Sequence, residues 1–311
     1  MNMTDKPIPG GDTVKVEFED GIAWVHLNRP EKRNAMSVGL AREMNSVFDA
    51  LEVDDRAGCI VLTGSGEAFS SGMDLKDFFR ATDGISDVER HRAYRETRAW
   101  QWRTLMYYAK PTIAMVNGWC FGGAFTPLIC CDLAITDEDA VFGLSEINWG
   151  IIPGGVVSKA ISTLMGDREA LYYVMTGEKF DGRRAKELGL VNEAVPRDRL
   201  KERTRELAKI LVDKNPTVLR QARMAYKYAR EMSWEQAAEY LTACYEEGPE
   251  VFLVGLRDVV EAQGGVSRTA QLSKLNRENL YRLVSRNGNP RLTSLNSVLS
   301  ALGLKVVFEA A

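Results

Sequence analysis

The segment Asn117–Gly155 reads NGWCFGGAFTPLICCDLAITDEDAVFGLSEINWGIIPGG, and it decides how the whole chain is interpreted. Gly122 and Gly123 precede Phe125–Cys131, an apolar run with the length and content of the start of a buried helix. Glycines at a helix start let a ligand approach backbone N–H groups, which the helix dipole makes electropositive. The segment therefore predicts a site for an oxygen that carries or develops negative charge. A helix start packed closely on a strand fits the same residues.

Glu146 is the second feature of this segment. It stands in an apolar context that includes Phe142, Leu144, Ile147 and Trp149. Apolar surroundings disfavour the charged form of a carboxyl group and raise its pKa, which suits a general acid or base. Glu146 is therefore a candidate catalytic residue, and an exposed loop glutamate is the alternative.

A second stretch with small residues, 60–75, reads IVLTGSGEAFSSGMDL. An apolar strand leads through a Gly/Ser turn into Ser71-Gly72-Met73-Asp74, and small residues after a strand again expose backbone amides. Two such amides aimed at one oxygen would form an oxyanion hole. An ordinary connection from strand to helix has the same spacing.

The composition is that of a soluble globular protein, with 45% hydrophobic and 27% charged residues among 311. This length allows one large domain or two. The net charge of −3 argues against a nucleic-acid footprint over the whole chain. The N-terminus MNMTDKPIPGGD lacks the apolar core of a secretory signal, and no run of ~20 apolar residues predicts a membrane span. We expect a cytoplasmic protein.

The five cysteines show no spacing typical of a metal site, and all but the last stand in apolar runs. They are predicted to be buried free thiols, as in a reducing cytosol. A reactive Cys120 beside the glycines is the alternative, although no nearby His or Lys would activate it. The cysteines are Cys59, Cys120, Cys130, Cys131 and Cys244.

Alternation and turn signals predict the main elements. The expected strands are Val14–Glu19, Ile22–Leu27, Cys59–Thr63, Pro111–Val116 and Val141–Phe142, with Cys59–Thr63 buried on both faces. The expected helices run from the N-cap Ser37 to about Glu52, from a start over Asp74–Arg80, from about Val88 to Tyr108, and over 156–166, 167–177, 181–189, 198–213, 216–231 and 233–247. The aromatic run Tyr94, Trp100, Trp102, Tyr107 and Tyr108 is a candidate pocket wall, which core packing would explain equally.

Several motifs, in this order, resemble the crotonase (enoyl-CoA hydratase/isomerase) superfamily. They are VHLNRPEKRNAMS (25–37), LTGSGEAFSSGMDLK (62–76), KPTIAMVNGWCFGGAF (110–125), CDLAIT (131–136) and FGLSEINWGIIPGG (142–155). WCFGGAFTPL and GLSEINWGIIPGG most resemble hydroxycinnamoyl-CoA hydratase-lyases, which convert feruloyl-CoA to vanillin. The resemblance covers roughly residues 12–247. It implies an α/β fold with a spiral of ββα turns over 12–197 and a helical trimerisation region over 198–248. It also implies an acyl-CoA substrate, a homotrimer or dimer of trimers, and no metal or further cofactor.

The resemblance assigns roles position by position. The amides of Met73 and Gly123 match the oxyanion hole that holds the thioester carbonyl, and Glu146 matches the catalytic carboxylate. Thr126 stands where ordinary enoyl-CoA hydratases carry a second glutamate, which points to a lyase with one carboxylate. Other positions that match substrate or coenzyme A contacts are Lys32, Ser71, Gly72, Asp74, Leu75, Lys76, Ala124, Phe125, Trp149 and Gly154.

Two positions depart from the hydratase-lyase pattern. The tyrosines that anchor the phenol of the substrate fall at Phe78 and Thr242, neither of which is phenolic. Tyr240, or a tyrosine of a neighbouring subunit, is a candidate replacement. The departure leaves open another aryl or alkyl acyl chain, or a reaction that stops at hydration as in a plain enoyl-CoA hydratase or isomerase.

Gly248-Pro249 predicts a break, and 249–311 reads as a small all-α unit. Its helices are expected at Val251–Gln263, Val266–Leu275, Asn276–Ser285 and Leu292–Leu302, with Asn276 an N-cap, Gly303 a C-cap and Leu304–Phe308 a closing strand. LNRENLYRLVSRNGNP (275–290) resembles helix-turn-helix antitoxins of addiction modules.

Residues 250–311 carry eight Lys or Arg and five Asp or Glu, a net charge of +3 that leaves −6 for the rest. A small basic helical unit suits phosphate contacts, with Asn276, Arg277, Asn279 and Arg282 placed to read bases. The alternatives are a helical cap that binds nothing and, for the whole chain, a DNA-binding regulator whose large domain senses acyl-CoA.

Overall fold

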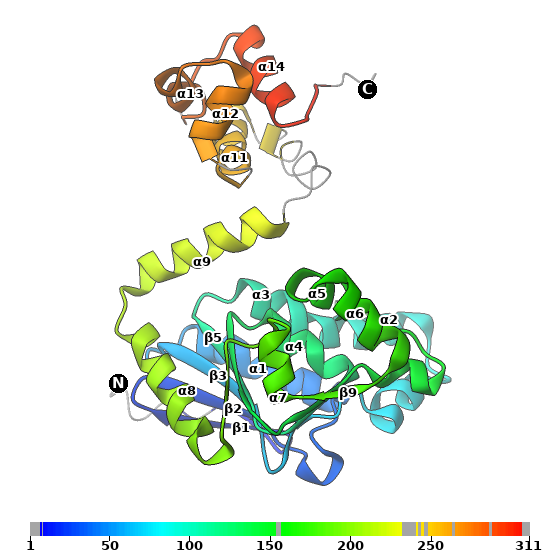
Figure 1. The fold of residues 1–311 in the computed structure, drawn as a ribbon. Coiled ribbons are helices and arrows are strands. Elements are labelled where there is room, and N and C mark those ends of the chain that lie inside the picture. Colours follow the sequence, from blue (N-terminus) through cyan, green and yellow to red (C-terminus); the bar gives the residue numbers. More distant parts are fainter. Residues whose placement is uncertain are drawn as a thin grey trace. The chain divides into compact units, whose positions relative to one another are not determined.

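The computed structural model describes residues 7, 9–153, 157–231, 241, 244–245, 248–262, 265–285 and 288–306 (Figure 1). The chain divides into two compact units, Met1–Arg220 and Gln221–Ala311. The sequence predicts a finer division into three regions, 12–197, 198–248 and 249–311, and this division stays a prediction.

Two sheets form the frame of the first unit. The larger has the order β1-β2-β3-β5-β7-β10, antiparallel between β1 and β2 and parallel elsewhere. The smaller has the order β4-β6-β8-β9, with only β8 and β9 antiparallel. The strands are β1 (Val14–Glu19), β2 (Ile22–Leu27), β3 (Cys59–Gly64), β4 (Ala68–Ser70), β5 (Thr112–Val116), β6 (Trp119–Phe121), β7 (Leu133–Asp137), β8 (Val141–Gly143), β9 (Lys179–Asp181) and β10 (Glu193–Val195).

Consecutive strands pass from one sheet to the other, which gives the predicted spiral. β3, β5 and β7 lie in the large sheet, and the strand that follows each of them, β4, β6 or β8, lies in the small one. A helical segment then leads to the next turn of the spiral. Because the turns repeat, the loops between the two sheets stack, and the two stretches quoted above become neighbours.

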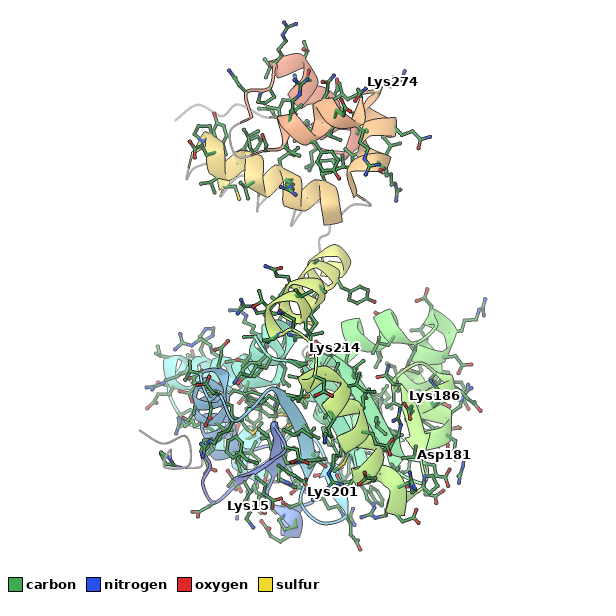
Figure 2. The ribbon with its side chains drawn as sticks, turned by 90° about the vertical axis from the view of Figure 1, so that its left-hand side faces the viewer. Lys15, Asp181, Lys186, Lys201, Lys214 and Lys274 are labelled. Atoms are coloured by element: carbon green, nitrogen blue, oxygen red, sulfur yellow. The ribbon has the colours of Figure 1, made fainter. Side chains whose placement is uncertain are left out.

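Both faces of the large sheet are buried. Along β3, Ile60 and Leu62 join the main core with α1 (Val38–Glu52), whereas Cys59 and Val61 face α8 (Arg197–Val212). This alternation follows from the two-residue period of a strand, and it confirms that β3 is buried on both faces. On the α8 side, the Lys201 ammonium lies 5.3 Å from the centre of the Trp24 ring (Figure 2).

The predicted helices of this unit are largely confirmed. Ser37 caps α1 by accepting a hydrogen bond from the Leu40 N–H. The segment predicted as one long helix comprises α2 (Asp87–Arg98), a π-helical turn Ala99–Thr104 and α3 (Leu105–Tyr107). The other helices are a π-helical turn Leu75–Phe79, α4 (Phe125–Cys130), α5 (Val157–Leu164), α6 (Asp167–Thr176), α7 (Gly182–Glu187) and α9 (Pro216–Glu231), which continues into the second unit.

Within the described residues of the second unit, α11 (Pro249–Ala262), α12 (Gly265–Ser273), α13 (Arg277–Leu283) and α14 (Leu292–Ala301) pack around a core of their own. Asn276 caps α13 by accepting from the Glu278 N–H, and Gly303 follows α14 with a φ of 69°, as predicted. Lys274 ends α12 in the left-handed region and is labelled in Figure 2. The predicted closing strand is absent over Leu304–Val306, and 307–308 lie outside the described residues. The predicted helix 233–247 also falls mostly outside them.

Among the helices described, none combines the length and apolar character that a membrane crossing requires. All five cysteines are buried and free, as expected. Burial raises the pKa of the Cys120 thiol, which argues against the reactive alternative.

Candidate active site

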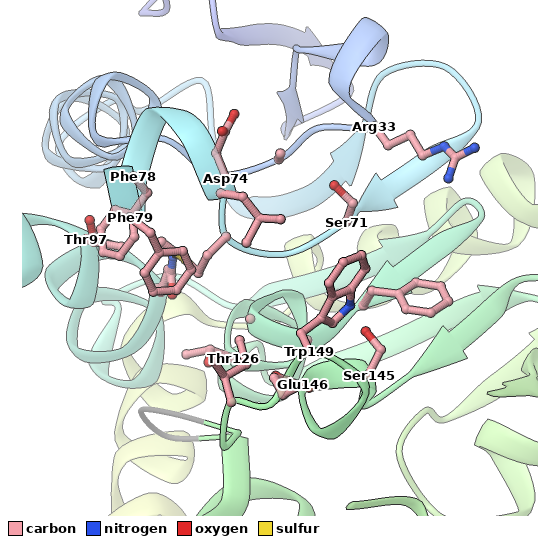
Figure 3. Close-up of a pocket in the computed structure, with 18 of the residues that line it drawn as sticks. Arg33, Ser71, Asp74, Phe78, Phe79, Thr97, Thr126, Ser145, Glu146 and Trp149 are labelled. Carbon is pink, nitrogen blue, oxygen red and sulfur yellow. The ribbon is translucent and has the colours of Figure 1, made fainter. Parts of the chain in front are cut away.

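A cavity of about 1240 Å³ opens in the first unit, where the loops between the two sheets meet (Figure 3). One wall carries Arg33 and Ser71, and the opposite wall carries Phe78, Phe79 and Thr97, with Thr126 and Glu146 between them. Trp149 and Ile152 are 70% and 82% exposed, so this part of the lining reaches the surface of the unit.

The Met73 amide is oriented by a backbone bridge to Met36. The Met36 N–H donates to the Gly72 carbonyl (2.8 Å), and the Asp74 N–H donates to the Met36 carbonyl (2.9 Å). Successive amides of an extended chain point to opposite sides. The Met73 N–H therefore points away from Met36, and Met73 lines the cavity.

Gly123 presents the second amide. It is the middle residue of the short 3-10 turn Gly122–Ala124 that leads into α4, so its N–H belongs to the helix start and has no acceptor within the helix. A Cβ atom added to Gly123 would lie 3.4 Å from the Met73 nitrogen, and one added to Gly72 would lie 3.1 Å from the Gly123 nitrogen. The two amides are therefore close enough neighbours to address one oxygen.

Glu146 lies in the 3-10 turn Ser145–Trp149, against the same glycines. A Cβ atom added to Gly122, whose φ is +50°, would lie 3.1 Å from Oε1 of Glu146. The side chain is only 9% exposed, and its Oε2 has no hydrogen-bond partner among the described residues. Burial raises the pKa of the carboxyl group. Such a group can exchange protons with a ligand in the cavity.

Ion pairs hold the loop that carries Met73. Arg29 contacts Asp74 (2.9 Å) and Asp77 (2.7 Å), and Lys32 also contacts Asp77 (2.7 Å). Burial alone would raise the pKa of Asp74, but the N–H groups of Asp77 and Lys76 and the Arg29 guanidinium together lower it. Asp74 thus caps the following helical turn. The pKa of Lys32 is raised, chiefly by its hydrogen bond to Asp77.

Comparison with known proteins agrees with this geometry. Residues 17–250 match the family model described as enoyl-CoA hydratase/isomerase. The chain belongs to the enoyl-CoA hydratase/isomerase family.

Two relatives and one solved structure show the range of similarity within this family. A hydroxycinnamoyl-CoA hydratase-lyase of Pseudomonas fluorescens is 59% identical over 231 residues, 74% of this chain and 84% of the relative. A putative enoyl-CoA hydratase of Thermus thermophilus is 35% identical over 66% of this chain and 80% of its own length. The crystal structure of an enoyl-CoA hydratase from Bacillus anthracis superimposes with a TM-score of 0.66 at 28% identity, covering 75% of this chain and 90% of that one. The predicted crotonase-type fold and enzyme class are confirmed.

The second unit has a separate match. Residues 225–310 match the family model described as a probable addiction module antidote protein. This agrees with the resemblance of the C-terminal region to helix-turn-helix antitoxins.

Most residues that were assigned to the site of this hydratase/isomerase-family chain do line the cavity: Lys32, Ser71, Met73, Asp74, Leu75, Phe78, Gly123, Thr126, Glu146 and Trp149. Four lie elsewhere. Lys76 is exposed outside the cavity, Gly72 and Ala124 are buried behind it, and Phe125 packs in the core against Phe142 and Phe180. Gly154, Tyr240 and Thr242 lie outside the described residues.

The sequence pattern missed several lining residues. Of the aromatic run, Tyr94 and Trp102 line the cavity, whereas Trp100 and Tyr108 are core residues and Tyr107 lies outside the lining. Helical spacing signals a shared face but does not show which face opens on a cavity. Other lining residues that were not singled out are Arg33, Phe79, Thr97, Arg98, Gln101, Trp119 and Ser145. Trp119 lies beneath two cations, Arg33 (4.6 Å) and Lys179 (5.5 Å).

Proposed function

We propose that the first unit hydrates a hydroxycinnamoyl-type CoA thioester and cleaves the product to an aromatic aldehyde and acetyl-CoA. The observation that carries this proposal is the buried Glu146 carboxyl group, with one oxygen unpaired in the described structure, beside the neighbouring amides of Met73 and Gly123. The 59% identity to a hydroxycinnamoyl-CoA hydratase-lyase supports the choice of substrate and reaction.

In the proposed mechanism, one carboxylate handles the protons and two amides hold the charge. Glu146 takes a proton from water as the oxygen adds to the β-carbon of the enoyl thioester, and it returns a proton to the α-carbon to give the β-hydroxyacyl thioester. It then takes the proton of the β-hydroxyl group as the bond between the α- and β-carbons breaks. Both steps place negative charge on the thioester oxygen, where the Met73 and Gly123 N–H groups would each contribute ~3–4 kcal/mol. Protonation of the resulting enolate gives acetyl-CoA.

This reaction requires no metal or cofactor apart from the coenzyme A of the substrate. Lys32, Ser71 and Trp149 are proposed to contact that part of the substrate. Lys32 already pairs with Asp77, so a phosphate would share its ammonium with that carboxylate. Thr126 lines the cavity, where ordinary hydratases of the family would carry a second carboxylate.

Incubation of the purified protein with feruloyl-CoA, with aldehyde release followed by absorbance, tests the proposal. We expect aldehyde and acetyl-CoA in equal amounts from the wild type. Unchanged turnover in Glu146→Gln would overturn the mechanism. Product that stops at the β-hydroxyacyl thioester would instead identify a plain enoyl-CoA hydratase, the activity after which two of the relatives are named.

DNA binding by the second unit is a separate candidate function, supported by the exposed face of α13. Arg277, Asn279 and Arg282 are exposed on this helix, while Leu280 and Leu283 face the core of the unit. Affinity for random duplex DNA should fall steeply with salt concentration, as counterion release requires. Arg277→Ala and Arg282→Ala should each lower that slope by about 1. A salt-independent affinity would argue against this function.

We also propose a homotrimer, or a dimer of trimers, in the cytoplasm. The family resemblance supports the assembly, and five buried free thiols support a reducing compartment. A native mass measurement of the full chain tests the assembly directly.

A further inference from the structure

The wall of the cavity opposite Arg33 is aromatic. The Phe78 ring makes edge contacts with Phe79 (centroids 5.2 Å apart) and with Tyr94 (5.0 Å), and all three residues line the cavity. Figure 3 shows Phe78 and Phe79 together with Thr97 on this side. Offset and edge-to-face arrangements are the geometry that aromatic rings prefer. This wall therefore suits a flat aryl group of the substrate.

Most polar groups on this wall are already engaged. The Thr97 hydroxyl donates to the Ala93 carbonyl (2.9 Å), and the Gln101 amide nitrogen contacts the sulfur atoms of Met36 (3.4 Å) and Met73 (3.5 Å). Phe78 and Phe79 have no polar side-chain atom. The Tyr94 hydroxyl, by contrast, makes no hydrogen bond within the part of the chain that the structure describes. Tyr94 thus offers a neutral hydroxyl with unused capacity to bind a polar substituent.

We propose that Tyr94 determines specificity by hydrogen bonding the ring hydroxyl of the aryl acyl group. The inference rests on the proposed function, since it assumes an acyl chain that carries such a hydroxyl. A ring hydroxyl that enters a site gives up its hydrogen bonds to water. A site that supplies a hydrogen-bond partner for it therefore discriminates strongly between a ring that carries the hydroxyl and a ring that lacks it.

Arg98 strengthens this assignment through its charge. It follows Tyr94 by four residues on α2, so the two lie on the same face of the helix, and both line the cavity. No ion pair engages Arg98 among the described residues. A nearby cation favours the ionised form of a phenol. The wall that carries the Tyr94 hydroxyl therefore also favours negative charge on the ring oxygen of the aryl acyl group.

Binding measurements test the inference separately from catalysis. Isothermal titration calorimetry with 4-hydroxycinnamoyl-CoA and cinnamoyl-CoA, in a Glu146→Gln background that keeps the thioesters intact, gives the preference for the hydroxylated ring. We expect Tyr94→Phe to lower this preference about tenfold while the affinity for cinnamoyl-CoA stays unchanged. The variant keeps the ring and its contact with Phe78, so unchanged cinnamoyl-CoA binding shows an intact pocket.

Thr97→Val is the matched control, because it removes a hydroxyl from the same wall that already has a partner. It should leave the preference unchanged. The inference is overturned if the parent shows no preference, if Tyr94→Phe retains it, or if Thr97→Val lowers it equally. Failure of the wild type to release aldehyde while it still binds both thioesters would overturn the proposed function and leave the role of Tyr94 standing.

Discussion

The two units differ in the kind of polar side chain that they bury: those described as buried in the first unit include carboxyl groups, whereas those in the second are hydroxyls. In the first, Glu146 is the one buried carboxyl group among the described residues that has an oxygen without a hydrogen-bond partner. In the second, buried Ser273 donates to the Thr269 carbonyl, and the charged residues of α13 are exposed. A buried carboxyl group with an unpaired oxygen costs stability, and proteins retain such groups where chemistry requires them. This comparison supports the proposal that the catalytic site lies in the first unit.

Among the variants that test this comparison, Glu146→Gln is expected to have the largest effect, which is on kcat. Glutamine keeps the shape of the side chain but cannot accept the proton, so kcat for aldehyde release should fall about 10³-fold, within the range measured for general bases. Glu31→Gln, an exposed position, is the matched control and should leave kcat unchanged. Steady-state kinetics with feruloyl-CoA provide the measurement. An equal loss of kcat in both variants would show that Glu146 has no special role in the reaction.

Leu280→Ala tests whether the second unit has a core of its own. Leu280 is fully buried among the apolar residues of that unit. Its truncation should destabilise the unit by about 2–5 kcal/mol while kcat of the first unit stays unchanged. Differential scanning calorimetry should show one transition that moves and one that does not. A shift of both transitions by the same amount would show that the two units unfold together.

Gly122→Ala probes the packing of the glycine turn against the Glu146 carboxyl group. Alanine is strained at a φ of +50°, and its methyl group would approach Oε1 of Glu146 to 3.1 Å. We expect kcat to fall about 10²-fold, because small displacements of a reacting group carry such penalties. Gly84→Ala separates the two causes, since Gly84 has a φ of +76° but open space around its Cβ. If Gly84→Ala lowers kcat equally, the contact with Glu146 is not the cause.

The sequence predicted those parts of the fold that local patterns specify. Alternation located β1, a hairpin turn signal located β2, a five-residue apolar run located β3, and cap residues located α1 and α13. The three-residue strands β4, β6, β9 and β10 and the five-residue strand β7 were missed, because such short stretches carry little or no period of their own. The small second sheet is therefore a tertiary feature.

The candidate site was likewise predicted from the sequence only in part. The residue pattern pointed to two glycine stretches and to Glu146, and the family resemblance then assigned the amides of Met73 and Gly123; all three residues line the cavity. Phe125 was assigned to the site with them, yet it points into the core, since a helix start places successive side chains on different faces. Gln101 gave no signal, because its position on the cavity wall depends on how the π-helical turn Ala99–Thr104 is oriented in the fold.

The smallest expected effect is a gain in thermal stability when Glu146 is replaced by glutamine. Burial raises the pKa of Glu146 above its value in the unfolded chain, so the folded state binds this proton more tightly. The free energy of unfolding therefore falls as the pH rises through the folded pKa, a penalty that an uncharged side chain at this position avoids. Glu146→Gln carries no charge and should melt about 2–4 °C higher at pH 7.

The difference between the two proteins should vanish below about pH 4, where the wild-type carboxyl group is protonated in both states. Thermal melts of Glu146→Gln, Glu31→Gln and the wild type across this pH range provide the measurement. Glu31→Gln should follow the wild type throughout, because its side chain is exposed. A Glu146→Gln variant that melts below the wild type at pH 7 would mean that the carboxylate stabilises the fold, and the contrast between the units would then lose its physical basis.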